Sequence, residues 1–140
     1  MKFEFKPSAV VLFALFAALY ALRLGWREGV WAAVVLLGSI LVHELGHVFA
    51  LRRHGIEIKA IGITHLGGFT RRASSDNWFA EVQSALAGPA ASLLLYFIFR
   101  SHSGEFFTTM ATANADIGLS NLIPIGPTDG RRLLRILLPA

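Results

Sequence analysis

The chain contains 140 residues, of which 54% are hydrophobic and only 16% are charged, and its mean hydropathy is +0.56. Soluble domains of this size keep roughly 25% of their residues charged, so the composition excludes disorder, a coiled coil and an ordinary soluble domain, and it indicates a membrane protein. The formal charge is +4, and the absence of cysteine excludes disulfides, thiolate metal sites and cysteine nucleophiles.

The first predicted element is a membrane span at about 7–24. The residues from Pro7 to Leu22 carry no charge, and Lys2 and Lys6 precede them. A cleaved signal peptide would also have a basic start and an apolar centre. No strict Ala-x-Ala site follows, and this favours an uncleaved span.

The second predicted span covers 29–51, and a loop of different composition follows at 52–78. The span is apolar through Val42 and then contains ionisable residues before it ends at two arginines. In the loop, β-branched residues, a partial alternation and the adjacent Gly67 and Gly68 predict a short β-hairpin, with a plain surface loop as an equal alternative.

The third predicted span covers 80–99 and the fourth covers 105–125. The third contains an uncharged run that is just long enough to cross a membrane. The fourth is interrupted by Asp116 and by Pro124. We expect Asp116 to face the protein interior or a water-filled path, or else to lie at the solvated end of a shorter fourth helix.

These elements predict an all-α polytopic membrane protein, with one membrane-embedded domain over 1–140. It has four transmembrane helices, with a short membrane-associated β-hairpin between the second and the third. The basic residues that would lie on the side of both termini are Lys2, Lys6, Arg52, Arg53, Lys59, Arg71, Arg72, Arg131, Arg132 and Arg135. The other side would hold only Arg23, Arg27 and Arg100. The positive-inside rule therefore places both termini in the cytoplasm, and it explains the basic charge without nucleic acid.

An H-E-x-x-H motif lies inside the second predicted span, at His43-Glu44-Leu45-Gly46-His47. Two histidines four residues apart share one helical face and can bind a single Zn²⁺ at about 2.0–2.1 Å. Glu44 lies close enough to accept a proton from a metal-activated water without being a ligand itself. Ionisable residues in a membrane span are costly, so a merely structural polar cluster is a poor explanation for all three.

A catalytic zinc ion needs a third protein ligand and one open position. The candidates are His54, His65, His102 and the acidic residues. We favour Asp129, because it follows the fourth predicted span, whose end lies on the same side as His47. Taken alone, Asp129 would more simply be the N-cap of a following helix.

Other polar and small residues have ordinary explanations at this stage. Arg71-Arg72 and Arg131-Arg132 are expected to be cytoplasmic anchors that contact anionic headgroups. Gly88 and Ser92 form a small-x-x-x-small pair that favours close helix packing. His65 is expected to be an exposed side chain, with a substrate contact or a regulatory ligand as the alternatives.

The order of the motifs resembles that of the site-2 protease family of zinc intramembrane metalloproteases. The resemblance rests on HELGH at 43–47, on Ala87-Gly88-Pro89 in the third span, and on Asn121-Leu-Ile-Pro124 leading to Asp129-Gly130. It covers about 29–132. Each piece alone is common, whereas the combination in this order is highly specific.

The resemblance implies a catalytic core of three helices, preceded here by one extra span. It implies that His43, His47 and Asp129 bind zinc, that Glu44 is the catalytic base, and that Asn121 helps to position the substrate or the oxyanion. The predicted hairpin resembles the family's membrane-associated β segment, which is thought to hold an extended substrate. Strand addition makes physical sense there, because a transmembrane helix must unwind before its peptide bond is attacked.

Two residues depart from the family pattern. Thr128 replaces the commoner leucine before Asp-Gly, and Ser92 stands where the Gly-Pro motif often continues to asparagine. The chain also has no room for a PDZ or CBS domain, so we expect either a minimal member of the family or a truncated core.

The predicted function is that of a zinc-dependent intramembrane endopeptidase, with one Zn²⁺ per chain, that cleaves transmembrane segments of other proteins near the cytoplasmic side. The expected location is the cytoplasmic membrane of a prokaryote, as a multi-pass protein in the lipid bilayer. One alternative is a proteolytically inactive zinc-binding scaffold. Another is a metal transporter whose path is lined by His43, Glu44, His47 and Asp116. The residues leave the substrate and the oligomeric state open.

Overall fold

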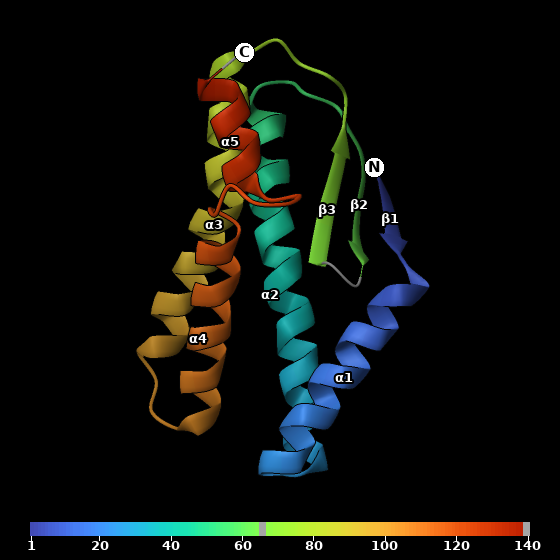
Figure 1. The fold of residues 1–140 in the computed structure, drawn as a ribbon, viewed down its shortest axis with the longest axis vertical. Coiled ribbons are helices and arrows are strands. Elements are labelled where there is room, and N and C mark those ends of the chain that lie inside the picture. The colour runs from blue at the N-terminus through green and yellow to red at the C-terminus, as the bar shows by residue number, and fades with distance from the viewer. Residues whose placement is uncertain (65–66, 139–140) are drawn as a thin grey trace.

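Helix α2 (Trp26–Arg53) forms the centre of the molecule in the computed structural model, which describes residues 1–64 and 67–138. Figure 1 shows α1 crossing one side of α2, α3 and α4 on the other side, and a small sheet beside the carboxyl-terminal half of α2. The elements follow in the order β1 (Lys2–Phe5), α1 (Pro7–Leu24), α2, β2 (Ile58–Thr64), β3 (Gly67–Arg72), α3 (Trp78–Arg100), α4 (Glu105–Ser120) and α5 (Asp129–Leu137).

The turn between α1 and α2 depends on two glycines. Gly25 has a φ of +104°, which glycine adopts without steric cost, and it ends α1 one residue before α2 begins. A side chain at Gly29 would collide with the α1 backbone at Ala17. The two helices can therefore pack closely, as small residues allow in membrane proteins.

The stretch between α2 and α3 contains two antiparallel strands, β2 and β3. A further strand, β1, pairs with β2 in parallel, so the sheet has three strands. The prediction of an all-α protein with a single hairpin therefore understated the β structure. The sequence pattern did not predict β1, because its alternation covers only four residues, Lys2–Phe5. The strand order β1-β2-β3 leaves β3 at the sheet edge that faces α2 (Figure 1). The expectation for His65 lies outside the described residues.

Three of the described helices, α1, α2 and α3, are long and apolar enough to cross a membrane. Helix α4 is shorter, because it ends at Ser120 and not near residue 125 as expected. The following segment contains Pro124 and Pro127, which lack the N–H that a helix needs, and Gly126, whose φ is +76°. The predicted end of the fourth element is therefore wrong, and a membrane crossing by α4 stays a prediction.

The position of Asp116 corrects one of our two expectations for this residue. Asp116 lies on α4, about one turn before the helix ends, and it is exposed. The expectation that it faces the protein interior is wrong. The structure agrees instead with the alternative, in which Asp116 lies near the end of a shorter fourth helix.

Two clusters of buried apolar side chains hold the elements together. One joins the end of α2, strand β2 and the start of α3, and it consists of Val48, Leu51, Ile56, Ile58, Ile61 and Ala80. The other joins α1, the middle of α2 and β2, and it consists of Ala9, Leu36, Ile40 and Ile63. Because β2 contributes to both clusters, it holds the sheet against the half of α2 that carries the H-E-x-x-H motif.

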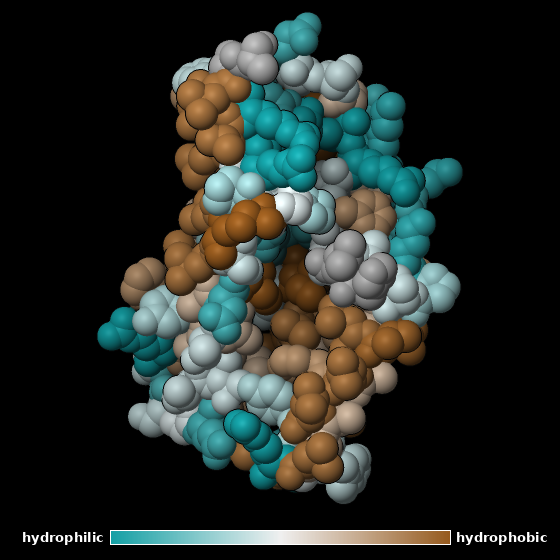
Figure 2. All heavy atoms as spheres, viewed as in Figure 1, coloured by the Kyte–Doolittle hydropathy of each residue, from teal (hydrophilic) through white to brown (hydrophobic). Residues whose placement is uncertain are grey.

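Large apolar side chains are exposed on the outer faces of the long helices, among them Leu15, Leu19, Trp31, Leu94 and Phe97. Figure 2 shows hydrophobic residues across the middle and lower right of this face and in a group at the upper left, and hydrophilic residues mainly at the upper centre and upper right. Apolar patches of this extent mark a surface that something other than water covers. In a chain with three membrane-length helices, that cover is lipid.

Candidate active site

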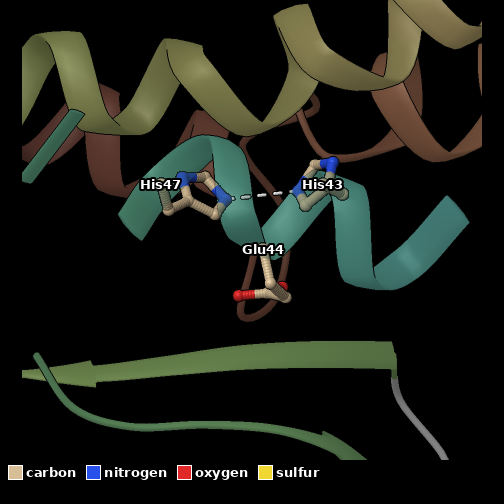
Figure 3. Close-up of side chains that lie close together, drawn as sticks. All are labelled: His43, Glu44 and His47. Carbon is tan, nitrogen blue, oxygen red and sulfur yellow. Dashed lines mark hydrogen bonds between the residues drawn. The ribbon is translucent and has the colours of Figure 1, made fainter. Parts of the chain in front are cut away.

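The two histidines of the motif and Asp129 meet at one point. His43 and His47 lie one turn apart on α2, and their rings approach each other (Figure 3). The Nε2 atoms of the two rings are 3.2 Å apart. The Oδ2 atom of Asp129 lies 3.2 Å from each of these nitrogens. The three atoms therefore form an equilateral triangle.

This triangle fits a tetrahedral zinc ion. Ligand atoms at about 2.0–2.1 Å from a tetrahedral ion lie roughly 3.3–3.4 Å from one another, which is close to the observed separation. Two imidazole nitrogens and one carboxylate oxygen are a suitable ligand set for a catalytic zinc site with an open fourth position. The side chains of His43, His47 and Asp129 are only 4%, 6% and 14% exposed.

Contacts behind the histidines decide which ring nitrogen faces the triangle. His47 Nδ1 lies 2.7 Å from the carbonyl oxygen of Ser84, which can only accept, so Nδ1 donates the hydrogen bond. The Nε2 atom of a neutral His47 then keeps a free lone pair. His43 Nδ1 lies 2.9 Å from the Ser92 hydroxyl. Partners of this kind orient the ligands of metal sites, so the two rings present the nitrogens that a shared metal ion would bind.

Gly88 on α3 makes room for both imidazole rings. A Cβ atom at this position would collide with His47 Nε2 and His47 Cε1, and would lie 2.8 Å from His43 Nε2. The adjacent Pro89 is buried inside α3, and it does not end the helix. The Ala87-Gly88-Pro89 motif therefore lets α3 lie directly against the two rings.

Glu44 points away from the two rings and toward the sheet (Figure 3). Its Oε2 atom accepts a hydrogen bond of 2.7 Å from the hydroxyl of Thr70 on β3. A side chain at Gly68, on the same strand, would collide with the Glu44 carboxylate. Glu44 also lies near enough to the histidines that one oxygen is within 4.8 Å of their ligand atoms. This geometry suits a proton acceptor beside a metal better than a ligand.

Asp129 is the first residue of α5, and the residue before it caps the helix. The Thr128 hydroxyl accepts a hydrogen bond of 3.3 Å from the Arg131 amide. The Asp129 side chain is therefore not needed as the N-cap and can point to the histidines. Burial favours the neutral form of the Asp129 carboxyl, but the contacts with His43 and His47 outweigh burial and lower its pKa to about 2. The group is thus an anionic ligand at neutral pH.

A cavity of about 230 Å³ adjoins the triangle. Its lining includes His43, Glu44, His47 and Asp129, and also Asn121 at the end of α4. The Asn121 side chain donates a hydrogen bond of 2.8 Å to the Ile117 carbonyl. The Asn121 backbone carbonyl accepts one of 2.7 Å from Gly130, which ties the α4 end to the residue after Asp129.

A buried carboxylate on α3 connects the elements that carry the site. Glu81 Oε2 accepts hydrogen bonds from Arg72 on β3, at 2.5 Å, and from Arg132 on α5, at 2.6 Å. Arg132 also donates to the Ser84 hydroxyl at 3.3 Å. Burial and the neighbouring Arg132 lower the pKa of Arg72, although Glu81 opposes this shift. Through Glu81, α3 holds both the strand that contacts Glu44 and the helix that begins with Asp129.

Two other candidates for a third ligand, His54 and His102, lie away from the triangle. His54 contacts Gln83, at 2.6 Å, near the surface. His102 contacts the Ile98 carbonyl at the far end of α3. His65 is not described, and the exposed Asp116 does not line the cavity. The sequence did not point to Ser84, Thr70 or Glu81, because no spacing along the chain marks them.

Comparisons with known proteins identify relatives of this chain. The family model of peptidase family M50 matches residues 31–104, which is more than half of the chain and includes the H-E-x-x-H motif. Asn121 and Asp129 lie beyond the matched residues. The structure is similar to that of a site-2 protease from Methanocaldococcus jannaschii, with a TM-score of 0.77 at 23% identity, over 96% of this chain and 66% of that chain.

Curated relatives include zinc metalloproteases. The chain is 35% identical over 135 residues to the putative zinc metalloprotease Rip3 of Mycobacterium tuberculosis, covering 81% of this chain and 32% of the relative. It is 29% identical over 119 residues to the zinc metalloprotease MJ0392 of Methanocaldococcus jannaschii, covering 77% of this chain and 35% of the relative. The chain thus spans about a third of the length of these two relatives.

Proposed function

The chain belongs to peptidase family M50, the family of the site-2 proteases, and from this we propose that it is a zinc-dependent endopeptidase that cleaves transmembrane segments of other proteins. The observation that carries the proposal is the triangle of His43 Nε2, His47 Nε2 and Asp129 Oδ2, with sides of 3.2 Å. These three residues would hold the zinc ion, and Glu44 would act as the base. The curated relatives support the choice of zinc.

A zinc ion in this position would supply Lewis acidity for peptide hydrolysis. The Glu44 carboxylate would accept the proton of the attacking water and later return it to the leaving amine nitrogen. Thr70 holds one oxygen of Glu44, so the base keeps a constant orientation while it exchanges protons. Asn121, which lines the same cavity, would donate a hydrogen bond to the scissile carbonyl oxygen.

The substrate would bind as an extended segment along β3. This strand lies at the edge of the sheet next to α2, and Gly68, Phe69 and Thr70 line the cavity. A strand edge offers a row of backbone donors and acceptors to an unwound peptide. Such pairing would replace the helical hydrogen bonds that the substrate loses when it unwinds.

The site would lie in the half of the membrane nearer the cytoplasm. His43 is seventeen residues along α2 from Trp26 and ten from Arg53, so it lies about 25 Å and 15 Å from the two helix ends. The basic residues at the Arg53 end indicate the cytoplasmic side of a multi-pass protein. Cleavage there would release a cytosolic fragment of the substrate.

The experiment compares the wild-type chain with Glu44→Gln in detergent. We expect equal zinc content in both proteins, and cleavage of single-span membrane substrates by the wild type only. Equal cleavage by Glu44→Gln would exclude Glu44 as the base. Zinc without cleavage in either protein would favour the inactive scaffold, and metal flux in liposomes would reveal a transporter.

A further inference from the structure

The arginine pairs Arg71-Arg72 and Arg131-Arg132, which the sequence suggests as headgroup anchors, each contain one exposed and one partly buried side chain. The Arg71 side chain is 57% exposed and makes an ion pair of 3.3 Å with Glu4 on β1. The side chains of Arg72 and Arg132 are only 21% and 27% exposed. Both of them line the cavity that contains the metal ligands and Glu44. One arginine of each pair therefore belongs to the site.

These two arginines have one carboxylate between them. Arg72 and Arg132 both donate to the same oxygen, Oε2, of Glu81. The acidic residues that line the cavity are Glu44 and Asp129. Asp129 contacts both histidines, and one oxygen of Glu44 lies within 4.8 Å of their ligand atoms. Two negative charges there would balance the charge of a zinc ion. Among the described residues, one of the two guanidinium charges is therefore left without a counter-charge near the cavity.

A second cavity continues the basic surface along α5. It has a volume of about 500 Å³ and shares Pro127, Thr128 and Arg132 with the first cavity. Its lining also includes Arg131 and Arg135, and no acidic residue among the described positions. Figure 2 shows hydrophilic side chains in this upper part of the molecule. A row of arginines thus begins beside the metal ligands and leads away from them.

We infer that Arg72, Arg131, Arg132 and Arg135 form a subsite for an acidic segment of the substrate next to the scissile bond. The inference rests on the proposed function and names the chemistry of its substrate. Arginine binds carboxylates through two parallel hydrogen bonds, and partial burial strengthens such pairs. Arg132 donates to the Ser84 hydroxyl, and the Ser84 carbonyl orients His47. The row of arginines therefore starts beside the metal ligands, where the scissile peptide must lie. For this reason a peptide is a better ligand for the row than a lipid headgroup.

The test measures peptide binding, which needs no catalysis. The full chain with Glu44→Gln is loaded with zinc and placed in nanodiscs of zwitterionic lipid. Two fluorescent octapeptides are compared, each with four apolar residues followed by four polar ones. The polar residues are two aspartates and two glutamates in one peptide, and two asparagines and two glutamines in the other. Peptides with the reversed order test the opposite side of the scissile bond.

We expect the acidic peptide to bind at least about tenfold more tightly than the amide peptide, in one of the two orders. The preference should fall to threefold or less in Arg72→Gln and in the exposed double variant Arg131→Gln/Arg135→Gln. Arg71→Gln is the matched control, because it removes the same charge one residue away, and it should keep the preference. Equal zinc content and melting temperature show that each variant is folded.

Equal binding of both peptides to the parent protein would overturn the inference. So would an unchanged preference in the arginine variants, or an equal loss in Arg71→Gln, which would indicate bulk charge alone. Phosphatidylglycerol in the nanodiscs tests the headgroup alternative. If this lipid abolishes peptide binding to the parent protein, and does so only while the arginines are present, the row is a headgroup site and the inference is overturned. The proposed function fails separately, when the wild type loads zinc and cleaves no membrane substrate.

Discussion

Single residues on α3 decide whether the two histidines can hold a metal ion. Gly88→Ala places a methyl group against both rings, where a Cβ atom has no room. We expect at least about a tenfold loss of zinc affinity, because the rings must move from the triangle. Chelator competition and metal analysis measure the effect. Gly38→Ala on α2 is the matched control, since nothing lies within 4 Å of a Cβ atom there.

The hydroxyl of Ser92 acts on the metal site through His43. Ser92→Ala removes the partner of His43 Nδ1, 2.9 Å away, and leaves the ring free to turn. Loss of such an outer contact typically costs 10- to 100-fold in metal affinity, and we expect a loss within this range. Ser120→Ala, an exposed serine at the end of α4, should leave the zinc affinity unchanged. Equal affinities of the two variants would contradict this role of Ser92.

At the scale of secondary-structure elements, Glu81 joins β3 and α5 to α3. Glu81→Gln leaves Arg72 and Arg132 without their shared carboxylate. Removing one partner of a fully buried ion pair costs about 3–5 kcal/mol, and since these arginines are about a quarter exposed we expect roughly 1–3 kcal/mol. Hydrogen exchange should rise first in residues 129–137. Glu57→Gln, at an exposed position, is the control. Faster exchange of residues 129–137 in this variant as well would argue against a specific role of Glu81 in holding α5.

Helices α2 and α4 are connected by one polar contact in their buried interface. The Asn114 amide donates to the Ser39 hydroxyl at 3.0 Å and to the Met110 carbonyl at 2.8 Å. Hydrogen bonds between membrane helices average about 0.6 kcal/mol and reach about 1.7 kcal/mol. A double-mutant cycle of Ser39→Ala and Asn114→Ala should therefore give a coupling energy of this size. The same cycle with the exposed Thr112→Ala should give a value near zero.

At the scale of the whole molecule, the chain's orientation can be tested because it contains no cysteine. Ser74 precedes α3 and Ser103 follows it, and both are exposed. If the basic loops are cytoplasmic, a membrane-impermeant maleimide added to intact cells should label Ser103→Cys and not Ser74→Cys. Lysed cells should label both. The reverse pattern in intact cells would place the metal site near the outer side.

The elements were largely predictable from local sequence patterns. Uncharged apolar runs predicted α1, α2 and α3, because the backbone in lipid must satisfy its own hydrogen bonds and a helix does so within one segment. The pattern failed at two places. Proline and glycine after Ser120 end α4 earlier than hydropathy suggests, and the short strand β1 forms only because β2 offers it an edge.

The chemistry of the site in α2 could be predicted from local spacing. The spacing of His43 and His47 brings them to one helical face, and this follows from the helix repeat alone. The order of the motifs also pointed to Asp129, but this residue lies eighty-six residues from His43, and its contact with the histidines depends on the packing of α5 on α3. The same packing assigns Ser84, Ser92, Thr70 and Glu81 their contacts. Contacts between distant segments depend on how whole elements pack, and no local spacing encodes them.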